Sequence, residues 1–285
     1  MSNLKIAVQK SGRLHQDSMQ LLKDIGISIN NGKDQLKASA QNFPLEIFFL
    51  RNGDIPQYLK DGVVDVAIIG ENVLSEKATD IPKLEKLGFS KCRVSIAIPK
   101  GEKYESICDL EGKQIATSYP NTVNRFLEEN NINASIHVIN GSVEIAPNIG
   151  LADAIVDIVS SGSTLFKNNL TEKNVILTSE AVLSVSPKIS DSKQELLNTL
   201  RFRIRSVLKG RQSKYILLNA PDDKLNDIIK ILPGMNSPTV LPLAKKGWSS
   251  VHSVIDKNQF WEIIDALKQN GAEGILICSI EKMVI

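Results

Sequence analysis

Residues 151–164 combine the groups needed to bind an anion. An apolar stretch carries two acids, Asp153 and Asp157, and ends in a glycine flanked by hydroxyl residues. These residues, here called the serine loop, are Ser160, Ser161, Gly162, Ser163 and Thr164. Glycine lets the backbone approach an anion, hydroxyls donate hydrogen bonds, and a helix expected to follow would point its positive N-terminal end at the same place. The pattern predicts a loop for a phosphorylated sugar, with carboxylates holding sugar hydroxyls or a magnesium-bound group. A buried strand followed by a Ser-Gly turn is the alternative that this motif alone leaves open.

Two basic turns follow predicted strands elsewhere in the chain. The first contains Lys10 and Arg13, here called the basic turn. The second contains Arg51 and Asp54. Because open α/β sheets bind ligands at the carboxyl ends of their strands, these cations are candidates for binding a triphosphate or pyrophosphate. Solvated turns, and a helix N-cap role for Asp54, are the competing interpretations.

Three other segments end a strand or open a helix with residues able to contact a nucleotide or sugar. The candidates are Gly70, Glu71, Asn72, Thr117, Tyr119 and Glu144. A glycine at the end of an apolar strand permits close contact with a flat group such as a base, and hydroxyls there can donate hydrogen bonds. For Glu144, a salt bridge on a helix surface is equally compatible with the sequence.

Composition excludes several classes of protein. The chain has 285 residues with 34 basic and 32 acidic side chains, so its formal charge of +2 gives no basic excess for binding nucleic acid. The sequence has neither an export signal nor an apolar stretch approaching the roughly 20 residues that span a bilayer, so we expect a cytoplasmic protein without a membrane partner. Cys92, Cys108 and Cys278 lie in apolar contexts and are expected to be buried free thiols.

Several common catalytic motifs are missing from the sequence. The three histidines, His15, His137 and His252, are isolated and predict no zinc site. There is no Gly-x-Gly-x-x-Gly fingerprint, no P-loop and no Gly-x-Ser-x-Gly nucleophile elbow. Nicotinamide dehydrogenases, P-loop nucleotidases and serine hydrolases of the α/β type therefore lose support.

The elements that must position these residues follow an α/β pattern. Val- and Ile-rich runs alternate with amphipathic stretches, which predicts parallel sheets with helices on their faces. The expected strands are 5–9, 45–50, 64–69, 93–99, 114–117, 134–138 and 154–159, and the expected helices are 15–25, 55–61, 122–130, 142–149 and 192–207.

This alternation predicts three domains. Residues 1–93 with 180–210 form one catalytic lobe and 94–179 form a second, around a central cleft that resembles type II periplasmic binding proteins. Residues 211–285 show the order βαββαβ, which predicts a ferredoxin-like, ACT-like domain. Because this last domain has a complete pattern and no obvious catalytic group, we interpret it as a regulatory or assembly module.

Six ordered motifs closely resemble the ATP phosphoribosyltransferase family, whose enzymes begin histidine biosynthesis. They are Gln9-Lys-Ser-Gly-Arg-Leu14, Ile115-Ala-Thr-Ser-Tyr-Pro120, Asn140-Gly-Ser-Val-Glu-Ile-Ala-Pro147 and residues 54–56, 62–74 and 152–165. Residues 232–243 and 280–283 look like the C-terminal domain of the long form of this family. Because the motifs keep their order over nearly the whole chain, together they are far more specific than any one of them.

The resemblance implies magnesium-dependent transfer of a phosphoribosyl group from phosphoribosyl pyrophosphate (PRPP) to N1 of ATP, with release of pyrophosphate. The serine loop would then take the 5′-phosphate of PRPP, and Asp153 and Asp157 would hold ribose hydroxyls. Lys10, Arg13 and Arg51 would neutralise phosphates, while residues 70–72 and Tyr119 would face the nucleotide. Mg²⁺ would be bound mainly through substrate phosphates. No general base is assigned, because N1 of adenine already carries a lone pair.

The same resemblance implies feedback inhibition by histidine and a homo-oligomer that moves between dimer and hexamer. The candidate effector residues are Asn219, Met235, Ser237, Thr239 and Ile277. Asn219 departs from an Asp present in some relatives, and an amide can accept a hydrogen bond only without the assistance of charge.

Two rival functions fit parts of the sequence. A ligand-sensing receptor would explain two lobes around a cleft, but not the C-terminal domain. A phosphoribosyltransferase that acts on a free base would share the acidic run and serine loop, but not the basic turn or the C-terminal domain.

Overall fold

The computed structural model describes residues 3–30, 36–77, 80–232, 234 and 237–284. The chain divides into two compact units, residues 1–197 and 198–285. Helix α6 (Gln194–Gln212) runs across this division, and its side chains Leu197, Leu200 and Ile204 are buried. The first unit contains two separate sheets, here called lobe I and lobe II, and the second contains a third sheet.

Lobe I is a six-stranded sheet in the order β2-β3-β1-β4-β11-β5. Its strands are β1 (Leu4–Gln9), β2 (Lys37–Ser39), β3 (Leu45–Leu50), β4 (Val66–Gly70), β5 (Lys83–Lys86) and β11 (Ala181–Val185), and its helices are α1 (Arg13–Asp24), α2 (Ile55–Asp61) and α3 (Glu71–Glu76). The apolar run that forms β4 lies at the centre of the sheet, and its side chains from Val66 to Ile69 are fully buried. Such a strand is solvent-free because helices cover the sheet.

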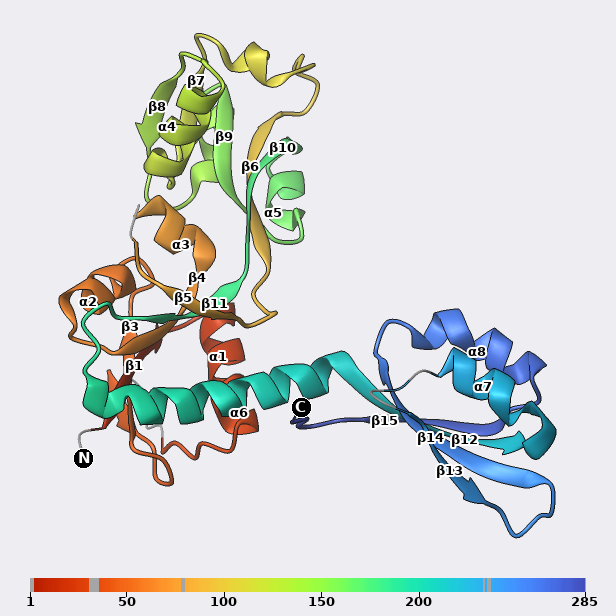
Figure 1. Ribbon diagram of the computed structural model, residues 1–285. Coiled ribbons are helices and arrows are strands. Elements are labelled where there is room, and N and C mark those ends of the chain that lie inside the picture. The colour runs from red at the N-terminus through yellow and green to blue at the C-terminus, as the bar shows by residue number, and fades with distance from the viewer. Residues whose placement is uncertain (1–2, 31–35, 78–79, 233, 235–236, 285) are drawn as a thin grey trace. The chain divides into compact units, whose positions relative to one another are not determined.

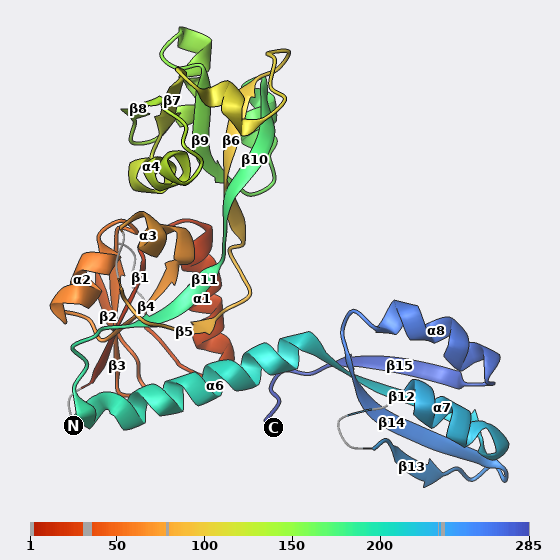
Figure 2. The ribbon, with the colours of Figure 1, turned by 45° about the horizontal axis from the view of Figure 1, so that its top comes forward.

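Lobe II is a five-stranded sheet in the order β10-β6-β9-β7-β8. Its strands are β6 (Cys92–Pro99), β7 (Gln114–Thr117), β8 (Ser135–Val138), β9 (Ala154–Val159) and β10 (Leu170–Ser179), and its helices are α4 (Pro120–Glu129) and α5 (Ser163–Lys167). Strands β6 and β10 run side by side between the two lobes (Figure 1, Figure 2). Because only Glu180 separates β10 from β11 of lobe I, these two strands fix where the lobes meet.

Both sheets differ from the parallel arrangement expected from the sequence. The strands β3, β1 and β4 are parallel in lobe I, as are β8, β7 and β9 in lobe II. The strands that connect the lobes instead pair antiparallel, β6 with both β9 and β10, and β11 with β4. The pattern of buried residues predicts where strands lie. It does not show whether two strands pair parallel or antiparallel where the chain crosses from one sheet to another.

The helix expected at residues 142–149 is absent from this part of the structure. Two 3-10 turns, Val143–Ile145 and Pro147–Ile149, take its place. Pro147 lacks the N–H that would continue an α-helix, and Gly150 has a positive φ of 72° that ends the segment. The segment therefore forms helical turns as its amphipathic spacing predicts, but the proline divides it into two short 3-10 turns.

The lobes are tied together by α3 of lobe I and the start of α4 of lobe II. The buried Glu76 carboxylate accepts hydrogen bonds from Thr122 N at 2.9 Å, Thr122 Oγ1 at 2.8 Å and Asn121 N at 3.0 Å. Arg125 also donates to Ser75 O at 3.0 Å. A carboxylate from one lobe thus satisfies the free N–H groups that begin a helix of the other.

The C-terminal unit is a ferredoxin-like domain. Its elements are β12 (Ser213–Pro221), α7 (Leu225–Ile231), β13 (Thr239–Pro242), β14 (Trp248–Asp256), α8 (Phe260–Gln269) and β15 (Glu273–Ser279). The strands pair antiparallel in the order β13-β14-β12-β15, and both helices lie on one face of the sheet (Figure 1). Ile216, Leu218, Ile228, Val251 and Leu267 form its core. The predicted fold class, two α/β lobes followed by a βαββαβ domain, is confirmed.

The expectation of buried thiols is wrong. Cys92 is partly buried, whereas Cys108 and Cys278 are exposed. Cys108 belongs to a single 3-10 turn and Cys278 to the edge strand β15, so their apolar sequence neighbours do not enclose them. In the described ranges we find no helix with the length and apolar character needed to cross a bilayer.

Candidate active site

The serine loop lies at the carboxyl end of β9 and is open to solvent. Ser160, Ser161, Ser163 and Thr164 are exposed. Gly162 has a φ of +78°, a left-handed conformation that glycine adopts without strain. The helix that follows, α5, has only five residues, so its dipole adds little, and hydroxyl and amide groups are the main donors available here.

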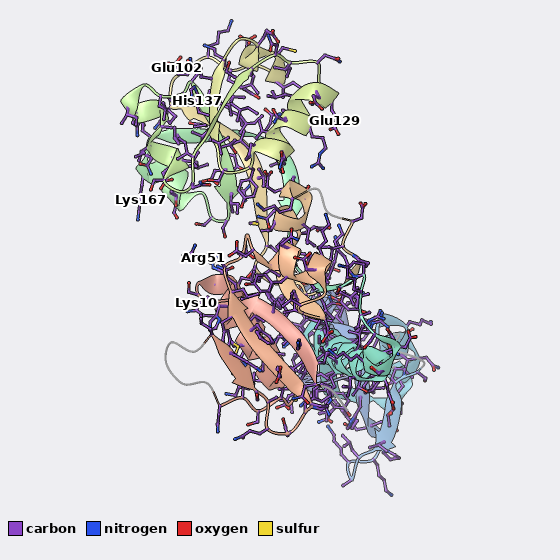
Figure 3. The ribbon with its side chains drawn as sticks, turned by 90° about the vertical axis from the view of Figure 1, so that its left-hand side faces the viewer. Lys10, Arg51, Glu102, Glu129, His137 and Lys167 are labelled. Atoms are coloured by element: carbon purple, nitrogen blue, oxygen red, sulfur yellow. The ribbon has the colours of Figure 1, made fainter. Side chains whose placement is uncertain are left out.

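The basic turn of lobe I reaches the serine loop of lobe II. Arg13, the first residue of α1, donates from Nη1 to Ser160 Oγ at 2.8 Å. Lys10 and Arg51 follow Gln9 and Leu50, which are register partners in the parallel strands β1 and β3. Figure 3 shows Lys10 and Arg51 close together on lobe I. The structure therefore brings three predicted phosphate-binding cations to one edge of a sheet, and one of them to the loop.

Asp54 occupies the N-cap position of α2. Its side chain is exposed and makes no capping hydrogen bond within the described residues. The backbone of Asp54 is held instead by a hydrogen bond of 3.0 Å from its N–H to Arg51 O. The carboxylate is thus available to a ligand near the second basic turn.

An ion pair beside the serine loop was not anticipated from the sequence. Arg93 on β6 binds Glu172 on β10 through two hydrogen bonds, one from Nε to Oε1 and one from Nη2 to Oε2 at 2.5 Å. The guanidinium lowers the pKa of the Glu172 carboxyl, and the carboxylate raises the pKa of Arg93. The third nitrogen of the Arg93 guanidinium, Nη1, donates to Ser160 O at 3.2 Å. The one sequence feature that could have indicated this pair is the charged Arg93 at the start of the otherwise mostly apolar strand β6.

Asp157 and Tyr119 are titratable groups near the serine loop and the lobe junction whose pKa values are raised. Burial raises the pKa of Asp157, and the charge of Glu144 raises it further, while a hydrogen bond from Ile158 N to Asp157 Oδ1 at 2.8 Å opposes the shift. Burial also raises the pKa of Tyr119, with a further contribution from the charge of Asp157. The phenol therefore keeps its proton and can donate a hydrogen bond to a ligand.

The junction of β4 and α3 is organised around Asn72. Its backbone N–H donates to Ser179 Oγ at 2.9 Å, and that hydroxyl donates to Asn72 Oδ1 at 2.9 Å. Asn72 Nδ2 donates to Tyr119 Oη at 3.0 Å, which links the two lobes. A Cβ at Gly70 would overlap Asn72 Oδ1. Gly70 thus makes room for an asparagine, a role different from the predicted contact with a base.

A cavity of ≈ 380 Å³ joins the rim of lobe I to the serine loop. It is lined by Glu71, Lys86, Lys91, Cys92, Arg93, Ser160, Thr178, Ser179 and Glu180. Glu71 is paired with Lys83 at 2.6 Å, and Lys86 lies 3.8 Å from Glu180. Cations and hydroxyls thus share this cavity with two carboxylates.

Two predicted site residues lie elsewhere or have another role. Asp153 precedes β9, so the six residues of that strand, about 20 Å at ~3.3 Å per residue, separate it from the serine loop. Its carboxylate accepts from Gln114 N at 2.9 Å and lines a different cavity of ≈ 450 Å³. Thr117 is fully buried, and its hydroxyl accepts from Tyr119 N at 2.9 Å. Asp153 is therefore removed from the site, and Thr117 shapes the turn that presents Tyr119.

The predicted effector residues of the C-terminal unit divide between the two faces of its sheet. Asn219 and Thr239 alternate with core residues and lie on the face without helices. Ile277 is half-buried against the core on the helical face, opposite to Asn219 and Thr239. Ser237 is exposed before β13, and Met235 lies outside the described residues.

The carboxylates of this region determine what kind of magnesium site the protein can offer. Within the described ranges no group of three or more His, Cys, Asp or Glu side chains could enclose a metal ion. Asp157 and Glu144 are close enough for one charge to act on the pKa of the other. One or two carboxylates suit Mg²⁺ that takes its other ligands from water and substrate phosphates.

Comparisons with known proteins agree over almost the whole chain. A model of the ATP phosphoribosyltransferase family matches residues 51–206, and a model of the C-terminal domain of HisG matches residues 210–282. An ATP phosphoribosyltransferase of Parabacteroides distasonis is 54% identical over 282 residues, covering 99% of this chain and 100% of that protein. Another from Cytophaga hutchinsonii is 53% identical over 281 residues, covering 99% and 98%.

A solved structure is similar to much of the chain. The ATP phosphoribosyl transferase (HisG:HisZ) complex from Thermotoga maritima aligns with a TM-score of 0.64 at 32% sequence identity. The alignment covers 72% of this chain and 98% of the other.

Proposed function

The chain belongs to the ATP phosphoribosyltransferase family, a family of pentosyltransferases that begins histidine biosynthesis, and we propose that it transfers the phosphoribosyl group of PRPP to N1 of ATP. The observation that carries this proposal is the hydrogen bond of 2.8 Å between Arg13 Nη1 and Ser160 Oγ. A site for two polyanions needs cations and hydroxyl donors that face one another. The basic turn and the serine loop supply both.

The chemistry requires positioning more than a protein nucleophile. The bond from the anomeric carbon to pyrophosphate breaks, and a bond from that carbon to N1 of adenine forms while the ribose carries positive charge. The half-buried Asp157 suits the ribose hydroxyls and this charge, and Lys10, Arg13 and Arg51 suit the phosphates. Holding N1 in line with the anomeric carbon contributes about 7–11 kcal/mol in favourable cases.

Magnesium belongs to the same proposal. The ion would be held mainly through substrate phosphates, with Asp157, three residues before the serine loop, as the candidate protein ligand. When bound, Mg²⁺ neutralises the negative charge that grows on the departing pyrophosphate. Tyr119, which keeps its proton, would donate a hydrogen bond to the bound ligand.

Regulation by histidine is proposed for the C-terminal unit, together with assembly between dimer and hexamer. Asn219 and Thr239 share the face of the sheet that carries no helices, which supports a common ligand for them. The division of residues 1–93 with 180–210 from residues 94–179 is likewise proposed as the boundary of the two catalytic lobes. The separate sheets of lobe I and lobe II support this division.

The test is a reconstituted assay with the full chain. We expect an ultraviolet-absorbing product and pyrophosphate when ATP, PRPP and Mg²⁺ are all present, and neither when one is omitted. Arg13→Met should lower kcat/KM for PRPP roughly tenfold or more, since it removes a charged donor. Lys23→Met, at the other end of the same helix, is the matched control and should leave kcat/KM unchanged. Product from free adenine but not from ATP would favour the rival phosphoribosyltransferase.

A further inference from the structure

Ser160 is held from two sides. Arg13 binds its hydroxyl from lobe I, and Arg93 binds its carbonyl oxygen from lobe II. Because the peptide group is planar and trans, the N–H of Ser161 must point away from the carbonyl that Arg93 holds. The orientation of Arg93 thus decides where the first amide of the serine loop is directed.

The orientation of Arg93 depends in turn on Glu172. The carboxylate receives Nε and Nη2 of Arg93 and a third hydrogen bond from Ser95 Oγ at 2.8 Å. A guanidinium held through two parallel bonds cannot rotate, so its third nitrogen has one direction only. Strand β10 also has two register irregularities between Glu172 and Leu177, and such bulges redirect side chains.

We propose that Arg93 and Glu172 are a positioning pair that holds the serine loop in the conformation that binds the sugar phosphate. The identity of that ligand rests on the proposed function, whereas the role of the pair in ordering the loop rests on the contacts alone. Neither residue needs to touch the ribose or the reacting atoms. The pair acts through the backbone of Ser160.

A purely structural role would leave a different signature. The side chains of Arg93 and Glu172 are 33% and 24% exposed, so water screens their attraction and limits what the ion pair contributes to folding stability. Arg93 and Ser160 also line the same cavity. Loss of the pair should therefore affect phosphate binding far more than unfolding.

The test compares Arg93→Lys and Glu172→Gln with the wild-type chain. Lysine keeps the positive charge but has no second arm, and glutamine keeps the shape but loses the charge that holds the guanidinium. We expect KM for PRPP to rise roughly tenfold in each variant, while KM for ATP stays within about twofold, and the affinity for ribose 5-phosphate, measured by calorimetry, to fall in parallel. Glu172→Asp should recover part of the loss.

Asn174→Ala is the matched control on the same strand. Asn174 Oδ1 accepts a hydrogen bond of 2.7 Å from Tyr104 Oη, away from the serine loop. This variant should leave both KM values and ribose 5-phosphate affinity unchanged. Equal increases in KM for the two substrates, or a similar loss in Asn174→Ala, would overturn the positioning role. If the wild-type chain made no product from PRPP and ATP, the proposed function would fail, and ribose 5-phosphate affinity would still test the pair.

Discussion

Asp157 lies in surroundings that disfavour its own charge. Burial and the nearby Glu144 raise its pKa above the ordinary value of 3.8. Between the unfolded and folded pKa values the folded chain binds more protons, so stability falls as pH rises through this window. We predict that Asp157→Asn raises the melting temperature at pH 7–8. This gain should disappear below about pH 4, where the aspartic acid of the wild-type chain is as neutral as the asparagine that replaces it. Because charge is lost at the ligand, kcat/KM for PRPP should fall roughly tenfold or more.

Asp153→Asn is the control for this prediction, because it makes the same chemical change at the far end of β9. Asp153 is exposed, and an asparagine there can still accept the hydrogen bond from Gln114 N. Melting curves over a pH series, together with steady-state kinetics, should show neither the stability gain nor the loss of activity. A loss of activity as large as that of Asp157→Asn would return Asp153 to the site.

At the scale of elements, the junction of α3 and α4 depends on one buried carboxylate. Glu76 accepts three hydrogen bonds, two of them from backbone N–H groups at the start of α4. Glu76→Gln would place an amide donor against one of those donors, so we predict a loss of about 1–3 kcal/mol in the free energy of unfolding, measured in urea. Glu46→Gln, which breaks an ion pair of 3.0 Å with the half-exposed Lys37, should cost less than about 1 kcal/mol. Equal losses would mean that the carboxylate does not cap α4.

The serine loop depends on the backbone conformation of one residue. No described atom lies within 4 Å of a Cβ built on Gly162, so a substitution there is opposed by the positive φ and not by a clash. We predict that Gly162→Ala costs about 1–2 kcal/mol, while Gly162→Asn costs less because asparagine tolerates this conformation. Chemical denaturation measures both costs. If alanine and asparagine were equally tolerated, the loop would not hold its left-handed residue in solution.

The strands around the serine loop could be predicted from the sequence, but the positions of several side chains on them could not. Short apolar runs rich in Val and Ile predicted the strands that carry the serine loop and the basic turn, because strands of a sheet covered on both faces are buried at consecutive positions. These runs could not show that Asp153 lies before β9, whereas Asp157, four residues later, lies near the carboxyl end of that strand. The Arg93–Glu172 pair was also hidden, since 79 residues separate its partners and only the pairing of β6 with β10 brings them together.

At the scale of the whole molecule, the two compact units have separate cores and should respond to different ligands. Both tryptophans, Trp248 and Trp261, belong to the C-terminal unit, so tryptophan fluorescence follows its unfolding alone, whereas circular dichroism follows the whole chain. PRPP at a hundred times its dissociation constant stabilises the state that binds it by about 2.7 kcal/mol. We predict that PRPP raises the midpoint seen by circular dichroism and leaves the fluorescence midpoint in place, while histidine raises the fluorescence midpoint. A fluorescence midpoint that PRPP shifts and histidine does not would place the two ligands in the opposite units and refute this division of roles.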